Sequence, residues 1–108
     1  MLLGMKKRRE DFKFFKGLEG KAVTLRKMEI MKGSSSMVPE NTRTRGVLKV
    51  LGTEDDYILY ILGIGAHLYT SKVRNVERNF IEKRFDTSVD CCVFLTQTSV
   101  YQLERYRG

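Results

Sequence analysis

The segment CCVFLTQTSVYQLERY, residues 91–106, decides how the fold is interpreted, because it reads as two short β-strands separated by a polar break. Residues 91–95 and 100–106 are rich in Val, Phe, Tyr and Leu, which favour strands. In the second of these runs apolar and polar side chains alternate, as they do when one face of a strand is buried. The segment therefore indicates the closing hairpin of a small barrel, and an unrelated tail is the alternative.

Length and charge set the class of the protein and of its partner. With 108 residues, of which 42% are hydrophobic and 31% charged, the chain suits one globular domain, 1–108. The net charge of +7 favours an acidic partner, with nucleic acid as the first candidate. Residues 1–32 hold ten Lys/Arg and four Asp/Glu, so six of the seven net charges lie there. A solvated basic face without a partner is the other interpretation.

Neither a membrane segment nor a secretory signal is predicted. No apolar run approaches the roughly 20 residues that cross a bilayer. The start, MLLGMKKRRE, places its charges after a very short apolar patch, which is the reverse of a signal peptide. Adjacent Cys91 and Cys92 point to opposite faces of a strand and are expected to be reduced packing residues. We expect a cytoplasmic protein without membrane contact.

The rest of the chain supplies a helix and three more strands. Residues 5–17 predict a short basic helix that ends at Gly17. A strand follows from Gly20, and the next two strands are predicted in GVLKVLG and DYILYILGIG, on either side of the turn GTEDD. A long loop, 32–46, is marked by its glycine, triple serine and the only proline.

The insert 66–90 between the third and fourth strands allows two conformations. Its piece HLYTSKVRNV alternates like an arm of an extended hairpin, whereas RNVERNFIEKRF is compatible with two helical turns. With the closing segment as strands four and five, the order predicts a mainly β fold. It consists of an N-terminal helix followed by a strongly bent, five-stranded antiparallel barrel of the SH3 type.

Enzymatic chemistry finds little support in the sequence. The only histidine, His67, has no partner motif, and no nucleophile elbow, zinc helix or phosphate loop is present. Glu54, Asp55 and Asp56 could bind a divalent cation, but three acidic residues in a turn are more often simply solvated. We expect no catalysis, no cofactor and no metal.

Basic residues interleaved with aromatic ones are better represented. Lys13 and Lys16 lie beside Phe12 and Phe15, and Tyr57 follows the acidic turn. Sites for single-stranded nucleic acid combine a cationic groove with aromatic rings on which bases stack. The alternative is that the phenylalanines belong to the core and that the tyrosine ring is buried.

These residues resemble the Sm and Sm-like (LSm) family, the relatives of bacterial Hfq. FFKGLEGKAVTL is similar to the family's N-terminal helix and first strand, through Gly20, Lys21, Val23 and Leu25. GVLKVLGTEDDYILYIL resembles the second and third strands, with Gly46, Leu48, Asp55 and Tyr57 at motif positions. VFLTQTSVYQLE resembles the second Sm motif, with Val93, Phe94, Leu95, Val100 and Leu103 at its apolar positions.

The resemblance implies a uridine pocket and a ring. Asp55 and Tyr57 would line the pocket together with Leu59, Thr96 and Gln97. RNA-binding members carry Asn where this chain has Leu59, and Arg-Gly where it has Thr96-Gln97; leucine cannot form a side-chain hydrogen bond. The resemblance also implies a homo-oligomer of six or seven subunits, in which strand four of one subunit joins strand five of the next.

Our leading hypothesis is an Sm-like ring that binds single-stranded RNA without catalysis. Lys13 and Lys16, with the run Lys6–Arg9, would contact phosphates from the face that bears the helix. A structural or protein-interaction ring that has lost the nucleotide pocket is the second hypothesis, motivated by Leu59 and Thr96-Gln97. A monomeric SH3-like barrel is the third.

Overall fold

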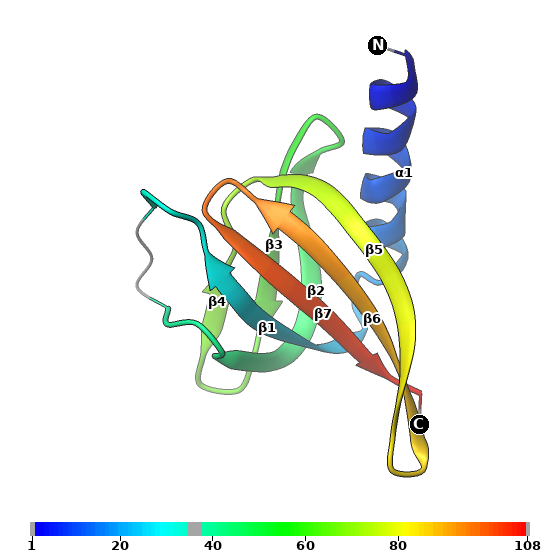
Figure 1. Cartoon of the computed structure of the whole chain (residues 1–108), viewed down its shortest axis with the longest axis vertical. Helices are drawn as coiled ribbons and strands as arrows, with labels where there is room; N and C mark the ends of the chain where they lie inside the picture. Colours follow the sequence, from blue (N-terminus) through cyan, green and yellow to red (C-terminus); the bar gives the residue numbers. More distant parts are fainter. Residues whose placement is uncertain (1, 35–37, 108) are drawn as a thin grey trace.

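The computed structural model describes residues 2–34 and 38–107 of the chain, with the backbone only for residues 2–5. One helix precedes a sheet of seven antiparallel strands in the order β4-β3-β2-β1-β7-β6-β5. The elements are α1 (Leu2–Gly17), β1 (Ala22–Ile30), β2 (Arg43–Thr53), β3 (Asp56–Leu62), β4 (His67–Tyr69), β5 (Val73–Arg84), β6 (Thr87–Thr96) and β7 (Ser99–Tyr106) (Figure 1). Within the described residues, no helix has both the length and the apolar character needed to span a membrane.

The mainly β fold with an N-terminal helix and an antiparallel sheet is confirmed, but the five-stranded barrel is wrong. The sheet is open and has seven strands. Its two edge strands, β4 and β5, are consecutive in the chain and separated only by residues 70–72. There Thr70 N donates to the carbonyl oxygen of Leu59 (2.9 Å), and Gln97 N donates to that of Lys72 (3.0 Å). The link 70–72 thus connects the two edges of a curled but open sheet, bonded to β3 on one side and to the β6–β7 turn on the other.

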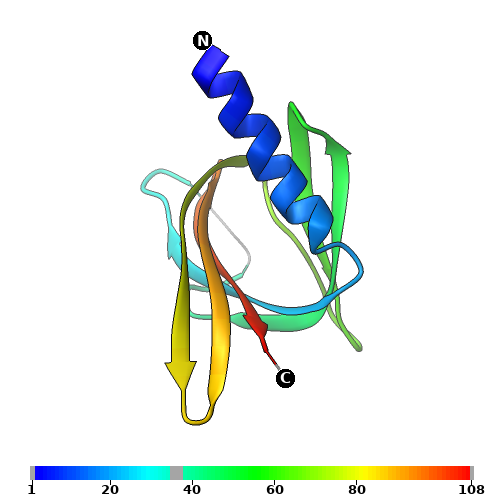
Figure 2. The ribbon, with the colours of Figure 1, turned by 90° about the vertical axis from the view of Figure 1, so that its right-hand side faces the viewer.

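The insert 66–90 forms β4, β5 and the start of β6 and contains no helical turn, so the helical alternative is wrong. Residues Val73 to Arg84 pair with residues Thr96 to Thr87 of β6. This pairing gives the backbone N–H and C=O groups the hydrogen-bond partners that they would otherwise find within a helix. The resulting β5–β6 hairpin projects beyond the rest of the sheet, away from the start of α1 (Figures 1 and 2). Its turn places Phe85 at φ 55° with its side chain fully exposed.

Strand β2 begins earlier than predicted, because part of the predicted loop 32–46 is extended. Arg43–Gly46 pair with β1, as Arg26↔Arg43 through Val23↔Gly46. Gly46 also passes close to β3: a Cβ built there would lie 2.4 Å from the carbonyl oxygen of Leu62. Only glycine permits this approach of the two strands.

The core lies between α1 and the concave face of the sheet, and strand alternation selects its members. On β3 every second residue is buried: Tyr57, Leu59 and Ile61. Phe15 of α1 is fully buried, with its ring centroid 5.2 Å from that of Phe94 on β6. The core members are Phe15, Val23, Leu25, Leu48, Val50, Tyr57, Leu59, Ile61, Leu68, Val76, Cys92, Phe94, Tyr101 and Leu103.

Helix α1 is attached to the β5 edge by an ion pair between the buried carboxylate of Asp11 and the half-exposed ammonium of Lys7. The carboxylate of Asp11 accepts a hydrogen bond from Val76 N (3.1 Å), and Lys7 Nζ donates to the carbonyl oxygen of Val76 (2.9 Å). Lys7 and Asp11 are also bonded to each other at 3.1 Å. The pair thus satisfies backbone groups of an edge strand that would otherwise be open to another chain.

The closing segment 91–106 forms two interior strands, which changes the predicted subunit interface. Strand β6 pairs with β5 and β7, and β7 pairs with β6 and β1. From Cys91 to Glu104 the two strands already have neighbours on both sides, so joining subunits along this stretch would require existing pairs to separate. The ring of six or seven subunits stays a prediction, and it would need another surface. Cys91 and Cys92 are free thiols, and both are buried.

Candidate nucleic-acid interface

The predicted uridine site is only partly assembled. Asp55, Tyr57 and Gln97 line one pocket of about 370 Å³ between α1, the β2–β3 turn and the β6–β7 turn. We call this the acidic pocket; its lining residues are Arg8, Asp11, Glu54, Asp55, Asp56, Tyr57, Lys72, Val73, Arg74 and Gln97. Leu59 and Thr96 are not among them.

Tyr57 and Leu59 belong to the core rather than to an open surface. Tyr57 is 3% exposed and Leu59 is fully buried. The Tyr57 ring packs against Phe12 and Phe15, with centroid distances of 5.0 and 6.2 Å. Burial raises the pKa of the Tyr57 hydroxyl, and the charge of Asp11 adds to this effect. With its ring enclosed in this way, Tyr57 offers no free face for a base to stack on.

Thr96 and Gln97 differ in accessibility. Thr96 is fully buried, and its hydroxyl closes the β6–β7 turn by accepting from Ser99 N and donating to the carbonyl oxygen of Ser99, both at 3.1 Å. Gln97 is exposed. The two predicted helix cations, Lys13 and Lys16, are also exposed, and Lys16 forms an ion pair with Glu19 at 2.8 Å.

The acidic turn beside this pocket is compensated by neighbouring cations. Glu54 pairs with Arg9 (3.6 Å), Asp55 with Arg8 (3.7 Å) and Asp56 with Lys72 (3.1 Å). The pocket lining holds four acidic and three basic side chains, which gives a net charge of −1. Among the described residues no group of three His, Cys, Asp or Glu side chains is arranged to hold a metal ion. An anionic ligand is therefore not favoured here.

A second concave surface collects arginines from the opposite face of the sheet. We call it the arginine groove; it has a volume of about 1180 Å³. Its lining residues are Thr24, Arg26, Arg43, Arg45, Arg78, Phe80, Glu82, Arg84, Thr87, Gln102, Glu104 and Tyr106. Five arginines and two glutamates give a net charge of +3.

Strand alternation explains why the arginines converge on this face. On β1, Arg26 follows the buried Leu25 and so points away from the core. On β7, Gln102 and Glu104 alternate with the core residues Tyr101 and Leu103. The β5–β6 hairpin runs across the direction of β1 and β2 (Figure 2), which brings Arg78 and Arg84 toward the same hollow.

A buried carboxylate forms the floor of the groove. Glu104 is 1% exposed and accepts hydrogen bonds from Arg84 Nη2 (2.6 Å) and Gln102 Nε2 (2.8 Å). Burial raises the pKa of Glu104, but the hydrogen bonds from Arg84 and Gln102 and the charges of Arg84 and Arg43 outweigh it, so the pKa lies below its usual value. The same hydrogen bond, followed by that to Glu82, raises the pKa of Arg84. Arg84 is thereby held in place and neutralised.

The other arginines keep their charge available to a ligand. Arg43 Nε lies 4.0 Å from Glu104 Oε1, at the limit of an ion pair. The Arg26 side chain donates to the amide oxygen of Asn41 (3.2 Å) and, among the described residues, forms no ion pair. Within the part of the chain that the structure describes, neither Arg45 nor Arg78 forms an ion pair with a carboxylate.

Two aromatic rings accompany these charges. The guanidinium of Arg78 lies 5.1 Å from the ring centroid of Phe80, and that of Arg84 lies 5.9 Å from the ring centroid of Tyr106. The Tyr106 hydroxyl accepts from Arg84 Nη1 (3.0 Å), and the side chain is 48% exposed. The groove therefore offers cations for phosphates and rings for bases on one surface.

None of the groove residues was among the predicted site residues. The signal that could have found them is the period of two in RTR, residues 43–45, which places two arginines on one strand face.

No family model matches the chain, and no curated protein or solved structure matches it either.

Proposed function

We propose that this protein binds single-stranded RNA without catalysis, and that the arginine groove is the contact surface. The observation that carries the proposal is the convergence of five arginines from the three strands β1, β2 and β5 with the rings of Phe80 and Tyr106. Guanidinium groups match phosphate oxygens through paired hydrogen bonds, and each retained cation strengthens attraction to a polyanion.

A single strand fits the groove better than a duplex does. Bases of a single strand are free to stack on aromatic side chains, whereas those of a duplex are stacked on each other. Phe80 and Tyr106 stand beside Arg78 and Arg84, so a nucleotide would meet a ring and a cation together. The acidic pocket plays no part in this proposal, because its charge repels phosphate.

Two further features belong to the same proposal. Cytoplasmic localisation is supported by the two free, buried thiols, since a reducing compartment keeps cysteines in this state. Oligomerisation into a ring is a separate prediction, which light scattering of the nuclease-treated protein tests by its mass.

The direct test is a fluorescence-anisotropy titration of a labelled twelve-nucleotide RNA at several salt concentrations. If about three phosphates are neutralised, log K should fall with log salt with a slope of about −2. An RNA duplex and poly-glutamate serve as competitors. A flat titration at low salt contradicts the proposal, and so does equal competition by poly-glutamate, which would indicate an acidic protein partner instead.

A further inference from the structure

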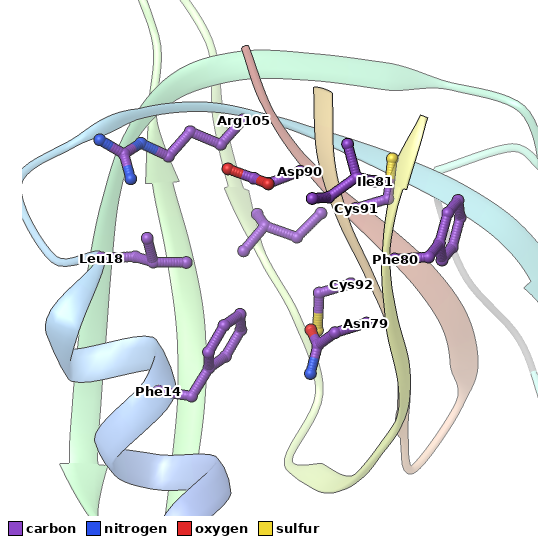
Figure 3. Close-up of a pocket in the computed structure, with 10 residues that line it drawn as sticks. Phe14, Leu18, Asn79, Phe80, Ile81, Asp90, Cys91, Cys92 and Arg105 are labelled. Atoms are coloured by element: carbon purple, nitrogen blue, oxygen red, sulfur yellow. The ribbon is translucent and has the colours of Figure 1, made fainter. Parts of the chain in front are cut away.

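A third hollow lies on the core side of the sheet, between α1 and the strands β5, β6 and β7. It has a volume of about 510 Å³, within the range of sites for small organic ligands. Its walls are mostly apolar: Phe14 and Leu18 come from the helix side, and Ile81 and Cys92 come from the strands (Figure 3). Leu103 of β7 also lines the hollow.

The apolar walls are open to a ligand. Phe14 is 37% exposed and Ile81 is 59% exposed, although both are large apolar side chains beside the hollow. Covering such surface contributes about 25 cal/mol for each Å² removed from water. Burial also raises the pKa of the Cys92 thiol to about 12, so this part of the wall stays neutral. The interior therefore favours the uncharged, apolar part of a ligand.

One end of the hollow carries charge. Asp90 and Arg105 lie opposite each other in the β6–β7 register, and both stand at the same end in Figure 3. Asp90 is already occupied, because Arg107 donates to its two oxygens at 2.8 to 3.1 Å, and this hydrogen bonding lowers the pKa of Asp90. Within the described residues the Arg105 side chain forms neither a hydrogen bond nor an ion pair, although its charge contributes to the lowered pKa of Asp90.

We propose that this hollow binds an amphipathic monocarboxylate, with its apolar chain on Phe14, Leu18 and Ile81 and its carboxylate on Arg105. Since Arg107 compensates Asp90, Arg105 supplies the cation that the ligand needs. The geometry fits a medium-chain fatty acid, because its apolar alkyl chain ends in a single carboxylate. This inference is independent of the arginine groove and of RNA binding.

Isothermal titration calorimetry with decanoate tests the site, with 1-decanol and acetate as ligands that lack the anion or the chain. We expect saturable binding of one decanoate per chain, weaker binding of decanol and none of acetate. Arg105→Gln should reduce decanoate affinity about tenfold, toward that of decanol, since a charge-assisted hydrogen bond is lost. Lys13→Gln removes the same charge from an exposed position outside the hollow and should change nothing.

A second variant tests the apolar wall. Ile81→Asp places a carboxylate at the rim and, because Ile81 is largely exposed, should leave folding intact as judged by circular dichroism. It should abolish binding of decanoate. The proposal is overturned if neither decanoate nor decanol binds saturably, if Arg105→Gln and Lys13→Gln have equal effects, or if Ile81→Asp binds decanoate as the natural chain does.

Discussion

The arginine groove and the acidic pocket are both hollows lined by charged side chains, but they differ in how the charges are compensated. In the acidic pocket each carboxylate of the β2–β3 turn has its own cation, on α1 or just before β5. In the groove five arginines face two glutamates, and both glutamates are engaged by Arg84. The turn carboxylates lie within reach of cations on neighbouring elements, whereas alternation places the arginines of β1, β2 and β5 on one face of the sheet, where they outnumber the glutamates.

This comparison also shows why charge counted along the sequence does not locate the proposed interface. The N-terminal thirty-two residues carry most of the net charge, yet Lys7, Arg8 and Arg9 are all paired with carboxylates. The available cations of the groove lie on strands instead: Arg26 on β1, Arg43 and Arg45 on β2, and Arg78 on β5. Net charge thus suggests a class of partner, whereas the surface proposed for it follows from the fold.

The largest effect is expected at Tyr57, where the sequence-based site and the structure disagree. Tyr57→Ala should lower the free energy of unfolding by about 4 kcal/mol, because it leaves a cavity beside Phe12 and Phe15. Urea denaturation measures this loss. Tyr57→Phe, the matched variant, keeps the ring and should bind RNA like the natural chain; weakened RNA binding would restore Tyr57 to the interface.

Prediction from sequence works best where the apolar pattern is strong. The segment 91–106 combines a continuous apolar run with an alternating one, and it forms most of β6 and all of β7. In the insert 66–90 the pattern is weak, because Val76 is the only buried residue of β5. Polar side chains on both faces of a projecting hairpin remove the period that separates a strand from a helix.

The residues of the candidate site were harder to predict than the strands, for a different reason. Tyr57 stands two and four residues before Leu59 and Ile61, so alternation already places it on the core face. That arrangement was readable in the sequence. The approach of Arg78 and Arg84 to Arg43 was not, because it depends on how the hairpin crosses β2. Long-range packing, rather than local pattern, assembles the groove.

The second largest effect is expected at the floor of the groove. Glu104→Ala leaves Arg84 without its main partner and should lower the free energy of unfolding by about 3 kcal/mol, as removal of one member of a buried ion pair does. Asp56→Ala breaks an exposed pair with Lys72 and should change stability by less than about 1 kcal/mol. If the two variants lose similar free energies of unfolding, the ion pairs of the two hollows do not differ in the way described.

Removal of a stacking ring should have a smaller effect. Phe80→Ala should weaken RNA binding about tenfold, since stacking of one base on an aromatic side chain contributes roughly 1–3 kcal/mol. Anisotropy titrations measure this change. Tyr69→Ala removes an aromatic ring that is 60% exposed on β4, away from the groove, and should leave affinity unchanged. If both variants bind equally well, Phe80 does not contact a base.

The smallest effect concerns pH. The folded-state pKa of Glu104 lies below its ordinary value of 4.5, so its ion pair stabilises the fold fully above that pH. This contribution is lost as the pH falls through the folded-state pKa, at no more than about 1.4 kcal/mol per pH unit for one group. Urea denaturation between pH 7 and 3 should show the decline. Glu104→Gln should flatten it; an unchanged profile would show that Glu104 is not its source.

The most direct test exchanges charge at the two hollows and measures RNA binding. Arg43→Glu with Arg45→Glu alters the groove, and Arg8→Glu with Arg74→Glu makes the same change of net charge at the acidic pocket. Anisotropy titrations with one labelled single-stranded RNA should show a loss of about thirtyfold or more for the groove variant and of less than about threefold for the pocket variant. Equal losses would show that binding follows net charge alone, and would contradict the assignment of the groove.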